Sequence, residues 1–191
     1  MLHQKYRRPN TVFYYIMMSF NMKPKQLPKN MALEIERRFF IPKIPPIDGV
    51  RVKEIKQYYT QVKDDTETRV RLEDGERCYV VTKVGFGMVR KETQIEVPTA
   101  SFEVWKPVSK SKVVKKTRYL IPYRKVTIEL DVYGGWLRGL VTAEVEFPSK
   151  KAAMEFVPPA WFGKELTGVE EYYNRSLAMK GMPKSFSRLR R

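Results

Sequence analysis

Charged and apolar residues alternate along much of the chain, in the period-two pattern that is typical of half-buried β-strands. Residues 32–40 (ALEIERRFF) show the alternation most clearly. The segments 66–72 and 78–83 flank Asp74-Gly75 and predict a hairpin, because Asp-Gly is a strong turn signal. Five further strands are predicted at 55–61, 89–97, 113–121, 126–133 and 141–147.

Three helical segments are predicted: 98–105 with Thr99 as a candidate cap, 150–156 after Ser149, and 169–180. About eight strands in consecutive antiparallel order, with few helices, predict an α+β protein that is mainly antiparallel sheet. Eight strands can close into a barrel with a narrow interior, and closure removes exposed strand edges. One set of alternating positions would then line a central channel.

Charges of like sign share a face on several of these strands. The acidic pairs are Glu34 and Glu36, Glu129 and Asp131, and Glu144 and Glu146; the basic pairs are Arg69 and Arg71, and Lys116 and Arg118. Residues two apart in a strand point to the same side, so each pair projects its charges together. A solvated sheet face explains any single pair. The joint pattern, which Lys83 and Arg90 extend, favours acid-only and base-only strands around a common interior.

The net charge of +16 comes mostly from the ends of the chain. Residues 1–30 hold six Lys or Arg and residues 180–191 hold five, with no acid in either segment, which leaves +5 for the body. We therefore expect a basic, poorly ordered extension at 1–30, a catalytic domain at 31–180 and a basic tail at 181–191. The tails suggest weak nucleic-acid contact, although a charged solvated tail is the simpler interpretation.

The counts of cysteine and histidine limit the chemistry. Cys78 is the single cysteine, which favours a reducing, cytoplasmic location. His3 is the single histidine and lies near the N-terminus, which excludes histidine-based catalysis and histidine-ligated zinc from the body. The apolar run at 12–20 is too short to span a bilayer and no small-residue cleavage site follows, so we expect no membrane association. Translation from Met31 is an alternative start.

A channel with acids on one side and bases on another suits a substrate that combines phosphates with a divalent metal. Mg²⁺ and Mn²⁺ prefer carboxylate oxygens and often bridge to substrate phosphates. Arginine holds phosphate oxygens through a planar fork, and lysine acts as a compact charge. Stabilisation of phosphoryl transfer depends largely on positioning and electrostatics, so no side-chain nucleophile is needed. The P-loop pattern G-x-x-x-x-G-K-[ST] is absent from the sequence.

The motifs, taken in order, resemble the CYTH superfamily of triphosphate tunnel metalloenzymes. They are E-I-E-R-R at 34–38, R-V-R at 69–71, T-K at 82–83, R-K-E at 90–92, K-T-R-Y at 116–119, I-E-L-D-V-Y at 128–133, A-E-V-E-F at 143–147 and the closing run at 161–178. The resemblance covers about residues 32–180. It implies a closed eight-stranded tunnel barrel with a few flanking helices, which binds triphosphate substrates with Mg²⁺ or Mn²⁺.

The resemblance also implies roles for individual residues. The implied catalytic residues are Glu34, Glu36 and Arg38; the metal-binding acids are Glu34, Glu36, Glu129, Asp131, Glu144 and Glu146; the phosphate-binding residues are Arg69, Arg71, Lys83, Arg90, Lys116 and Arg118. Tyr172 and Asn174 match a closing helix, for which packing is favoured over substrate contact. Arg38 departs from the family signature E-x-E-x-K, where lysine stands, and arginine is effectively always protonated. A role for this residue in proton exchange is therefore in doubt.

The leading hypothesis is metal-dependent hydrolysis of inorganic triphosphate by a monomer or homodimer. The same superfamily includes adenylate cyclases, thiamine triphosphatases and RNA 5′-triphosphatases, which remain alternatives. A non-catalytic module that binds polyphosphate or RNA is a hypothesis of a different class. Complete acidic pairs on three strands favour an enzyme, because a receptor for anions gains nothing from buried carboxylates.

Overall fold

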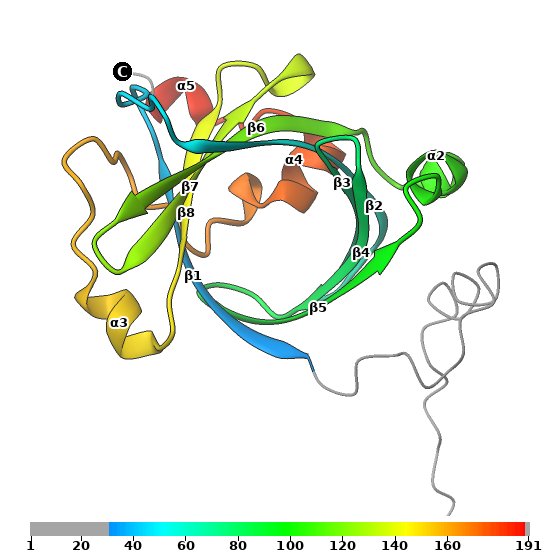
Figure 1. Cartoon of the computed structure of the whole chain (residues 1–191), viewed down its shortest axis with the longest axis horizontal. Coiled ribbons are helices and arrows are strands. Elements are labelled where there is room, and N and C mark those ends of the chain that lie inside the picture. The colour runs from blue at the N-terminus through cyan, green and yellow to red at the C-terminus, as the bar shows by residue number, and fades with distance from the viewer. Residues whose placement is uncertain (1–30, 190–191) are drawn as a thin grey trace, which may run out of the picture. The chain divides into compact units, whose positions relative to one another are not determined.

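The computed structural model describes residues 31–189, in which eight antiparallel strands form a closed barrel (Figure 1). The strands are β1 (Ala32–Phe40), β2 (Arg51–Lys63), β3 (Thr66–Glu73), β4 (Arg77–Val84), β5 (Val89–Val97), β6 (Val114–Tyr123), β7 (Val126–Tyr133) and β8 (Val141–Glu146). Their order around the barrel is β1-β5-β4-β3-β2-β6-β7-β8. The predicted closed eight-stranded barrel is confirmed.

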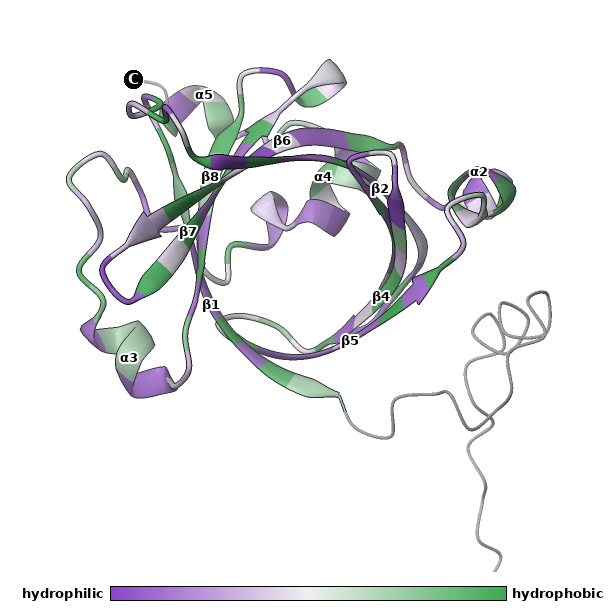
Figure 2. Cartoon of the chain, viewed as in Figure 1, coloured by the Kyte–Doolittle hydropathy of each residue, from purple (hydrophilic) through white to green (hydrophobic). Residues whose placement is uncertain are grey.

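The period-two pattern separates the interior of the barrel from its outer surface. Figure 2 shows hydrophilic and hydrophobic residues alternating along the strands. In β1 the even positions Glu34, Glu36 and Arg38 line the interior cavity, whereas Ile35 and Phe39 belong to an apolar cluster. This arrangement inverts that of an ordinary small barrel, because the inside is charged and the main core lies outside.

Apolar residues on the outer side of β1, β7 and β8 pack beneath the segment that follows β8. Helix α3 (Lys150–Glu155) covers this side of the barrel (Figure 1), and the hydroxyl of Ser149 caps it by accepting from the amide of Ala152 at 3.1 Å. The helix predicted to start after Ser149 is therefore confirmed. Aromatic rings fill the space below, with Phe39 and Phe162 at a centroid distance of 4.8 Å. Burial of this surface stabilises the strands that hold the acids described below.

The short helix α2 (Ser101–Trp105) packs on the barrel through Phe102, whose ring lies 4.9 Å from that of Tyr58. Thr99 does not cap this helix. Its hydroxyl donates to the carbonyl of Glu76 at 2.7 Å, and the N-cap position is Ala100 without a side-chain bond. The prediction of a threonine cap was wrong because the hydroxyl has a tertiary partner on the β3–β4 turn.

One end of the barrel is closed by an apolar plug. At this end the inward positions change from charged to aromatic or aliphatic, and the C-terminal elements pack against them. Helix α4 (Asn174–Lys180) appears across the ring of strands in Figure 1. Residues 181–189 add the helix α5 (Phe186–Leu189), whose Phe186 is buried in the same cluster. Short 3₁₀ turns complete the structure at Lys106–Val108 (η2), Gly135–Leu137 (η3) and Glu170–Tyr172 (η4).

The single helix predicted at 169–180 is interrupted. Tyr173 separates η4 from α4 with an extended backbone (φ −67°, ψ 140°). This conformation directs the tyrosine toward the barrel, where its hydroxyl accepts from the amide of Gly87 at 2.8 Å and its ring lies beneath Arg38 and Arg90. Predictions for residues 1–30 lie outside the described residues. Between residues 31 and 189, none of the helices has the length and apolar character needed to cross a membrane.

Candidate active site

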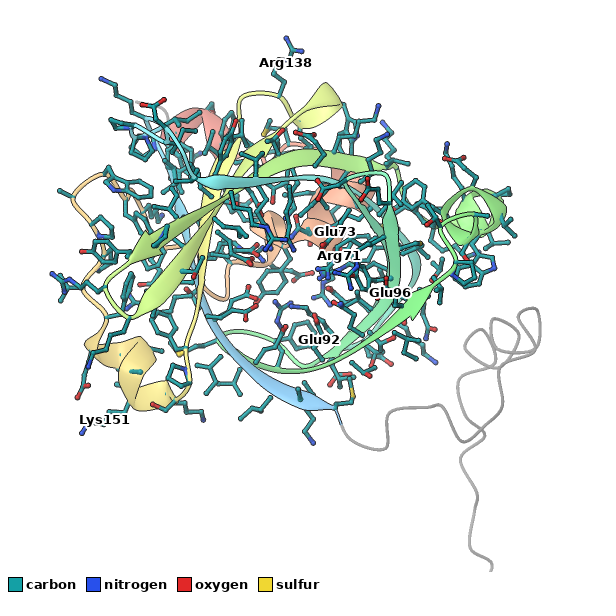
Figure 3. All side chains as sticks on the ribbon, viewed as in Figure 1. Arg71, Glu73, Glu92, Glu96, Arg138 and Lys151 are labelled. Carbon is teal, nitrogen blue, oxygen red and sulfur yellow. The ribbon has the colours of Figure 1, made fainter. Side chains whose placement is uncertain are left out.

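The barrel interior contains a charged cavity of about 250 Å³. Its lining includes the acids Glu34, Glu36, Glu67, Glu73, Glu92, Glu129, Glu144 and Glu146, and the bases Arg38, Lys53, Arg69, Arg71, Lys83, Arg90, Lys116 and Arg118. The eight acids equal the eight bases, so the charges of the lining nearly cancel. Figure 3 shows Arg71, Glu73 and Glu92 within the ring of strands, whereas Arg138 and Lys151 point away from it.

Glutamates on three neighbouring strands form one side of the cavity, the acidic wall. It consists of Glu34, Glu36, Glu129, Glu144 and Glu146 on β1, β7 and β8. In the strand register Glu36 is opposite Glu146, and Glu129 is opposite Glu144. Like charges directly opposite each other destabilise a sheet, so this arrangement needs compensating cations. The basic wall, which consists of Arg69, Arg71, Lys83 and Arg90 on β3, β4 and β5, supplies part of that compensation.

Several strands carry both signs, so the expectation of acid-only and base-only strands was wrong. On β3 the lining residues are Glu67, Arg69, Arg71 and Glu73, and β1 adds Arg38 to its two acids. The physical reason is that buried charges are costly unless paired. Sequence reasoning missed Glu67 and Glu73, although the pattern E-x-R-x-R-x-E places both in phase with the arginines. It also missed Lys53, Gln57 and Gln94, which line the cavity on β2 and β5.

Ion pairs connect the acidic and basic walls. Lys83 Nζ lies 2.5 Å from Glu34 Oε2 and 2.9 Å from Glu92 Oε2. Arg90 Nη2 donates to Glu36 Oε2 at 2.8 Å. Lys83 and Arg90, which were predicted to bind phosphate, are therefore paired with carboxylates, and a bound polyanion would have to replace those carboxylates.

Asp131 is fully buried and lies behind the cavity lining. Its Oδ1 accepts from Arg118 Nε at 2.7 Å and its Oδ2 from Arg118 Nη2 at 2.7 Å, and it also forms a hydrogen bond with Lys116. Burial and the neighbouring Arg118 lower the pKa of Lys116 to about 8. Of the six acids predicted to bind metal, Asp131 is thus the one that does not face the cavity.

Arg69 differs from the other arginines because its carboxylate partners are distant. Glu67 and Glu92 lie 3.8 and 3.7 Å from its guanidinium nitrogens, beyond hydrogen-bonding range, and its buried Nε has no partner among the described residues. The side chain is nevertheless buried, and its pKa is raised by nearby Tyr59, Glu92 and Glu67. The guanidinium of Arg69 hydrogen-bonds with Tyr59, whereas its buried Nε is a charged donor that no described residue engages.

Negative charge accumulates around Glu146. This side chain is exposed at the end of β8 and has neither a hydrogen bond nor an ion pair within the described part of the chain. Partial desolvation inside the barrel, together with Glu129 and Glu34, raises its pKa to about 7. Burial also raises the pKa of Glu34. In residues 31–189 no three acidic, histidine or cysteine side chains converge closely enough to hold a metal ion. The oxygen donors are those that hard cations prefer, but coordination would require the carboxylates to move.

Comparisons with known proteins agree with this geometry. No protein-family model matches the chain. It is 36% identical over 148 residues to the inorganic triphosphatase of Nitrosomonas europaea, covering 76% of this chain and 97% of that protein. It is 30% identical over 154 residues to the inorganic triphosphatase of Acetivibrio thermocellus, covering 77% and 94%. A crystal structure of an inorganic triphosphatase is similar with a TM-score of 0.60 and 33% identity, covering 81% of this chain and 99% of that one.

A closed antiparallel barrel around a charged interior defines the tunnel class of phosphate-binding enzymes. Together with these relatives, it shows that the chain belongs to the CYTH family of triphosphate tunnel enzymes. The resemblance read from the motifs is confirmed.

Proposed function

We propose that the protein hydrolyses inorganic triphosphate to orthophosphate and pyrophosphate with the help of a divalent cation. A water oxygen bonds to the terminal phosphorus, the bond from that phosphorus to the bridging oxygen breaks, and one water proton is released. The observation that supports this proposal most strongly is the cavity in which an acidic and a basic wall face each other. The activity named for both relatives agrees with it.

The acidic wall is the proposed cation site. The raised pKa of Glu146 marks an excess of negative charge that a cation would neutralise, and carboxylates are suitable ligands for Mg²⁺ or Mn²⁺. When bound, a divalent cation would withdraw charge from the phosphate oxygens and make the attacking water more acidic. We assign Asp131 a different role from its neighbours, because a buried aspartate paired with Lys116 and Arg118 orients those cations instead of facing the cavity.

The proposed phosphate-binding residues are the basic wall together with Lys116 and Arg118. Arginine and lysine stabilise the negative charge on the phosphoryl oxygens, and they act more strongly in a cavity with little water. Arg69 is the strongest candidate for a first contact, since no carboxylate lies within hydrogen-bonding distance of it. The other cations would exchange a carboxylate for a phosphate, and the released carboxylates of the acidic wall would then be available to the cation.

The lining favours inorganic triphosphate over larger substrates. Among the described residues Ile55 is the only apolar side chain that lines the cavity, and none of the lining residues is aromatic. A nucleobase or a thiazolium ring would therefore have no surface on which to stack or pack. The substrates of adenylate cyclase, thiamine triphosphatase and RNA 5′-triphosphatase each carry such a ring.

A phosphate-release assay tests the proposal. Tripolyphosphate, ATP, thiamine triphosphate and a 5′-triphosphorylated RNA are compared with Mg²⁺ or Mn²⁺, and cyclic AMP is measured in the ATP sample. We expect release from tripolyphosphate at least tenfold faster than from the others, and its loss in Glu34→Gln and Glu146→Gln. Glu103→Gln, on the exposed side of α2, is the matched control. Full activity in both tunnel variants would contradict the proposed site.

Contact with nucleic acid through the basic residues of both ends of the chain stays a separate prediction. Counterion release makes such binding weaken steeply with salt. Replacement of the six Lys and Arg of residues 1–30 and the five of residues 180–191 by glutamine, within the full chain, should abolish salt-dependent RNA binding and leave tripolyphosphate hydrolysis unchanged. A cytoplasmic location and a monomeric or dimeric state likewise remain predictions, which fractionation and light scattering would test.

A further inference from the structure

Arg38 stands where the family signature has lysine, and its guanidinium connects three parts of the structure. Nη1 donates to the carbonyl of Tyr172 at 2.7 Å. Nη2 donates to Glu36 Oε1 at 3.0 Å and lies 2.6 Å from Glu144 Oε1. The side chain is only 4% exposed, and its guanidinium lies 5.7 Å from the ring centre of Tyr173. A single side chain thus joins β1, β8 and the segment that closes the barrel.

These contacts need the planar fork of arginine. The carbonyl of Tyr172 binds one terminal nitrogen, and the two glutamates bind the other. Lysine offers one compact ammonium group with rotating donors, so it cannot hold partners in two fixed directions from two nitrogens. The main chain of residue 38 is held as well, because its amide donates to Thr167 Oγ1 at 3.0 Å and its carbonyl accepts from Leu166 at 2.7 Å.

Proton transfer is the role that lysine can perform and that this arginine cannot. Both terminal nitrogens are engaged, one by the carbonyl of Tyr172 and the other by the carboxylates of Glu36 and Glu144. Arginine is protonated at any pH at which the barrel is folded, so it cannot accept a proton from the attacking water. The guanidinium of Arg38 therefore keeps its positive charge and its orientation throughout a reaction cycle.

We propose that Arg38 is a positioning residue that fixes the carboxylates of Glu36 and Glu144 and anchors the closing segment at Tyr172 and Tyr173, without transferring a proton. This inference rests on the proposed function of the acidic wall. It replaces the catalytic role that the family signature implies at this position. The expected consequence is that Glu36 and Glu144 keep their orientation. Glu146 would move toward a bound ion, and Glu34 and Glu129 would follow once a phosphate replaces them at Lys83 and Arg118.

Arg37 provides a matched control one residue away on the same strand. It uses a similar fork on the outer face, donating to Glu165 at 2.8 and 2.7 Å and to the carbonyls of Ala153 and Phe156 at 2.9 and 3.1 Å. Arg37→Lys should therefore loosen residues 153–165, which cover the outer side of the barrel. Arg38→Lys should instead loosen residues 170–175, which close one end of it. Both substitutions retain the positive charge, so any difference between them reports geometry.

The first experiment measures Mn²⁺ binding by calorimetry in the full chain without substrate. Outer partners of metal ligands typically contribute about 10–100-fold to metal affinity. We expect Arg38→Lys to raise the Mn²⁺ dissociation constant at least tenfold, and Arg37→Lys to change it less than twofold. Hydrogen exchange should accelerate at residues 170–175 in Arg38→Lys and at 153–165 in Arg37→Lys. Unchanged Mn²⁺ affinity or unchanged exchange at 170–175 in Arg38→Lys would overturn the proposal.

The second experiment follows the pH dependence of kcat for tripolyphosphate at saturating cation. If Arg38 is a positioning residue, Arg38→Lys should lower kcat and leave the shape of the pH profile of kcat unchanged. A new ionisation in the alkaline limb, with kcat maintained or raised, would show that this position exchanges a proton and would overturn the proposal. If the wild-type protein releases no phosphate, the proposed function fails on its own, and the Mn²⁺ and exchange measurements still decide the role of Arg38.

Discussion

Replacement of Asp131 by asparagine should destabilise the barrel strongly, although the two side chains have nearly the same shape. Asp131 is fully buried and accepts two hydrogen bonds of 2.7 Å from Arg118 and a third from Lys116. The substitution removes the negative charge and leaves two buried cations with fewer partners. Breaking a buried ion pair in this way costs about 3–5 kcal/mol. For a domain of this size, such a loss lowers Tm by about 6–20 °C.

The pH dependence of this loss has a defined sign. The pKa of Lys116 is lowered to about 8 in the folded protein, and Asp131 is one of the groups that oppose this lowering. Without Asp131 the pKa of Lys116 falls further, and the folded variant binds fewer protons than the unfolded chain over a wider range. Its stability then rises with pH across that range. The deficit relative to wild type should therefore be larger at pH 6 than at pH 9.

Urea unfolding monitored by fluorescence measures the effect, with Asp48→Asn as the exposed control that should stay within about 0.5 kcal/mol of wild type. Tripolyphosphate should restore part of the lost stability, because a ligand that binds only the folded state stabilises it. A free energy of unfolding within about 1 kcal/mol of the wild-type value would contradict this prediction. A large loss of Mn²⁺ affinity with normal stability would instead assign Asp131 to the cation site.

Three further predictions concern other parts of the structure. The cation concentration for half-saturation should rise as pH falls through about 7, because the cation must displace a proton from Glu146, and calorimetry should show this dependence disappear in Glu146→Gln. Arg69→Lys should raise KM for tripolyphosphate roughly tenfold with a smaller change in kcat, because lysine cannot form the bidentate contact proposed between Arg69 and a phosphate. Steady-state kinetics that show a normal KM would contradict this. Ser149→Ala should lower the free energy of unfolding, measured with urea, by about 1 kcal/mol without changing activity, because it removes only the cap of α3.

The eight strands and the charged interior could be predicted from local pattern alone. Alternation places side chains on opposite faces whatever the tertiary context, so Glu34, Glu36 and Arg69 were assigned to the interior correctly. The same pattern could have revealed Glu67 and Glu73, which are in phase with Arg69 and Arg71. The expectation that each strand carries one sign obscured them.

Features that depend on contacts between distant segments could not be predicted. The extended backbone of Tyr173 depends on Gly87 and on the two arginines that lie over its ring, which belong to β1 and β5. Glu129 and Asp131 share a strand face, but only the folded barrel shows that Asp131 lies behind Lys116 and Arg118. Burial depth along one face depends on the neighbouring strands, and a period-two pattern does not encode it.

A crystal structure with Mn²⁺ and a non-hydrolysable triphosphate analogue would show directly whether the barrel interior is the substrate site. We predict the phosphate chain inside the barrel with contacts to Arg69 and Arg71, and an anomalous Mn²⁺ peak beside Glu34, Glu129 and Glu146. Asp131 should remain paired with Arg118. An analogue bound on the outer surface, or Mn²⁺ coordinated by Asp131, would contradict the proposed site.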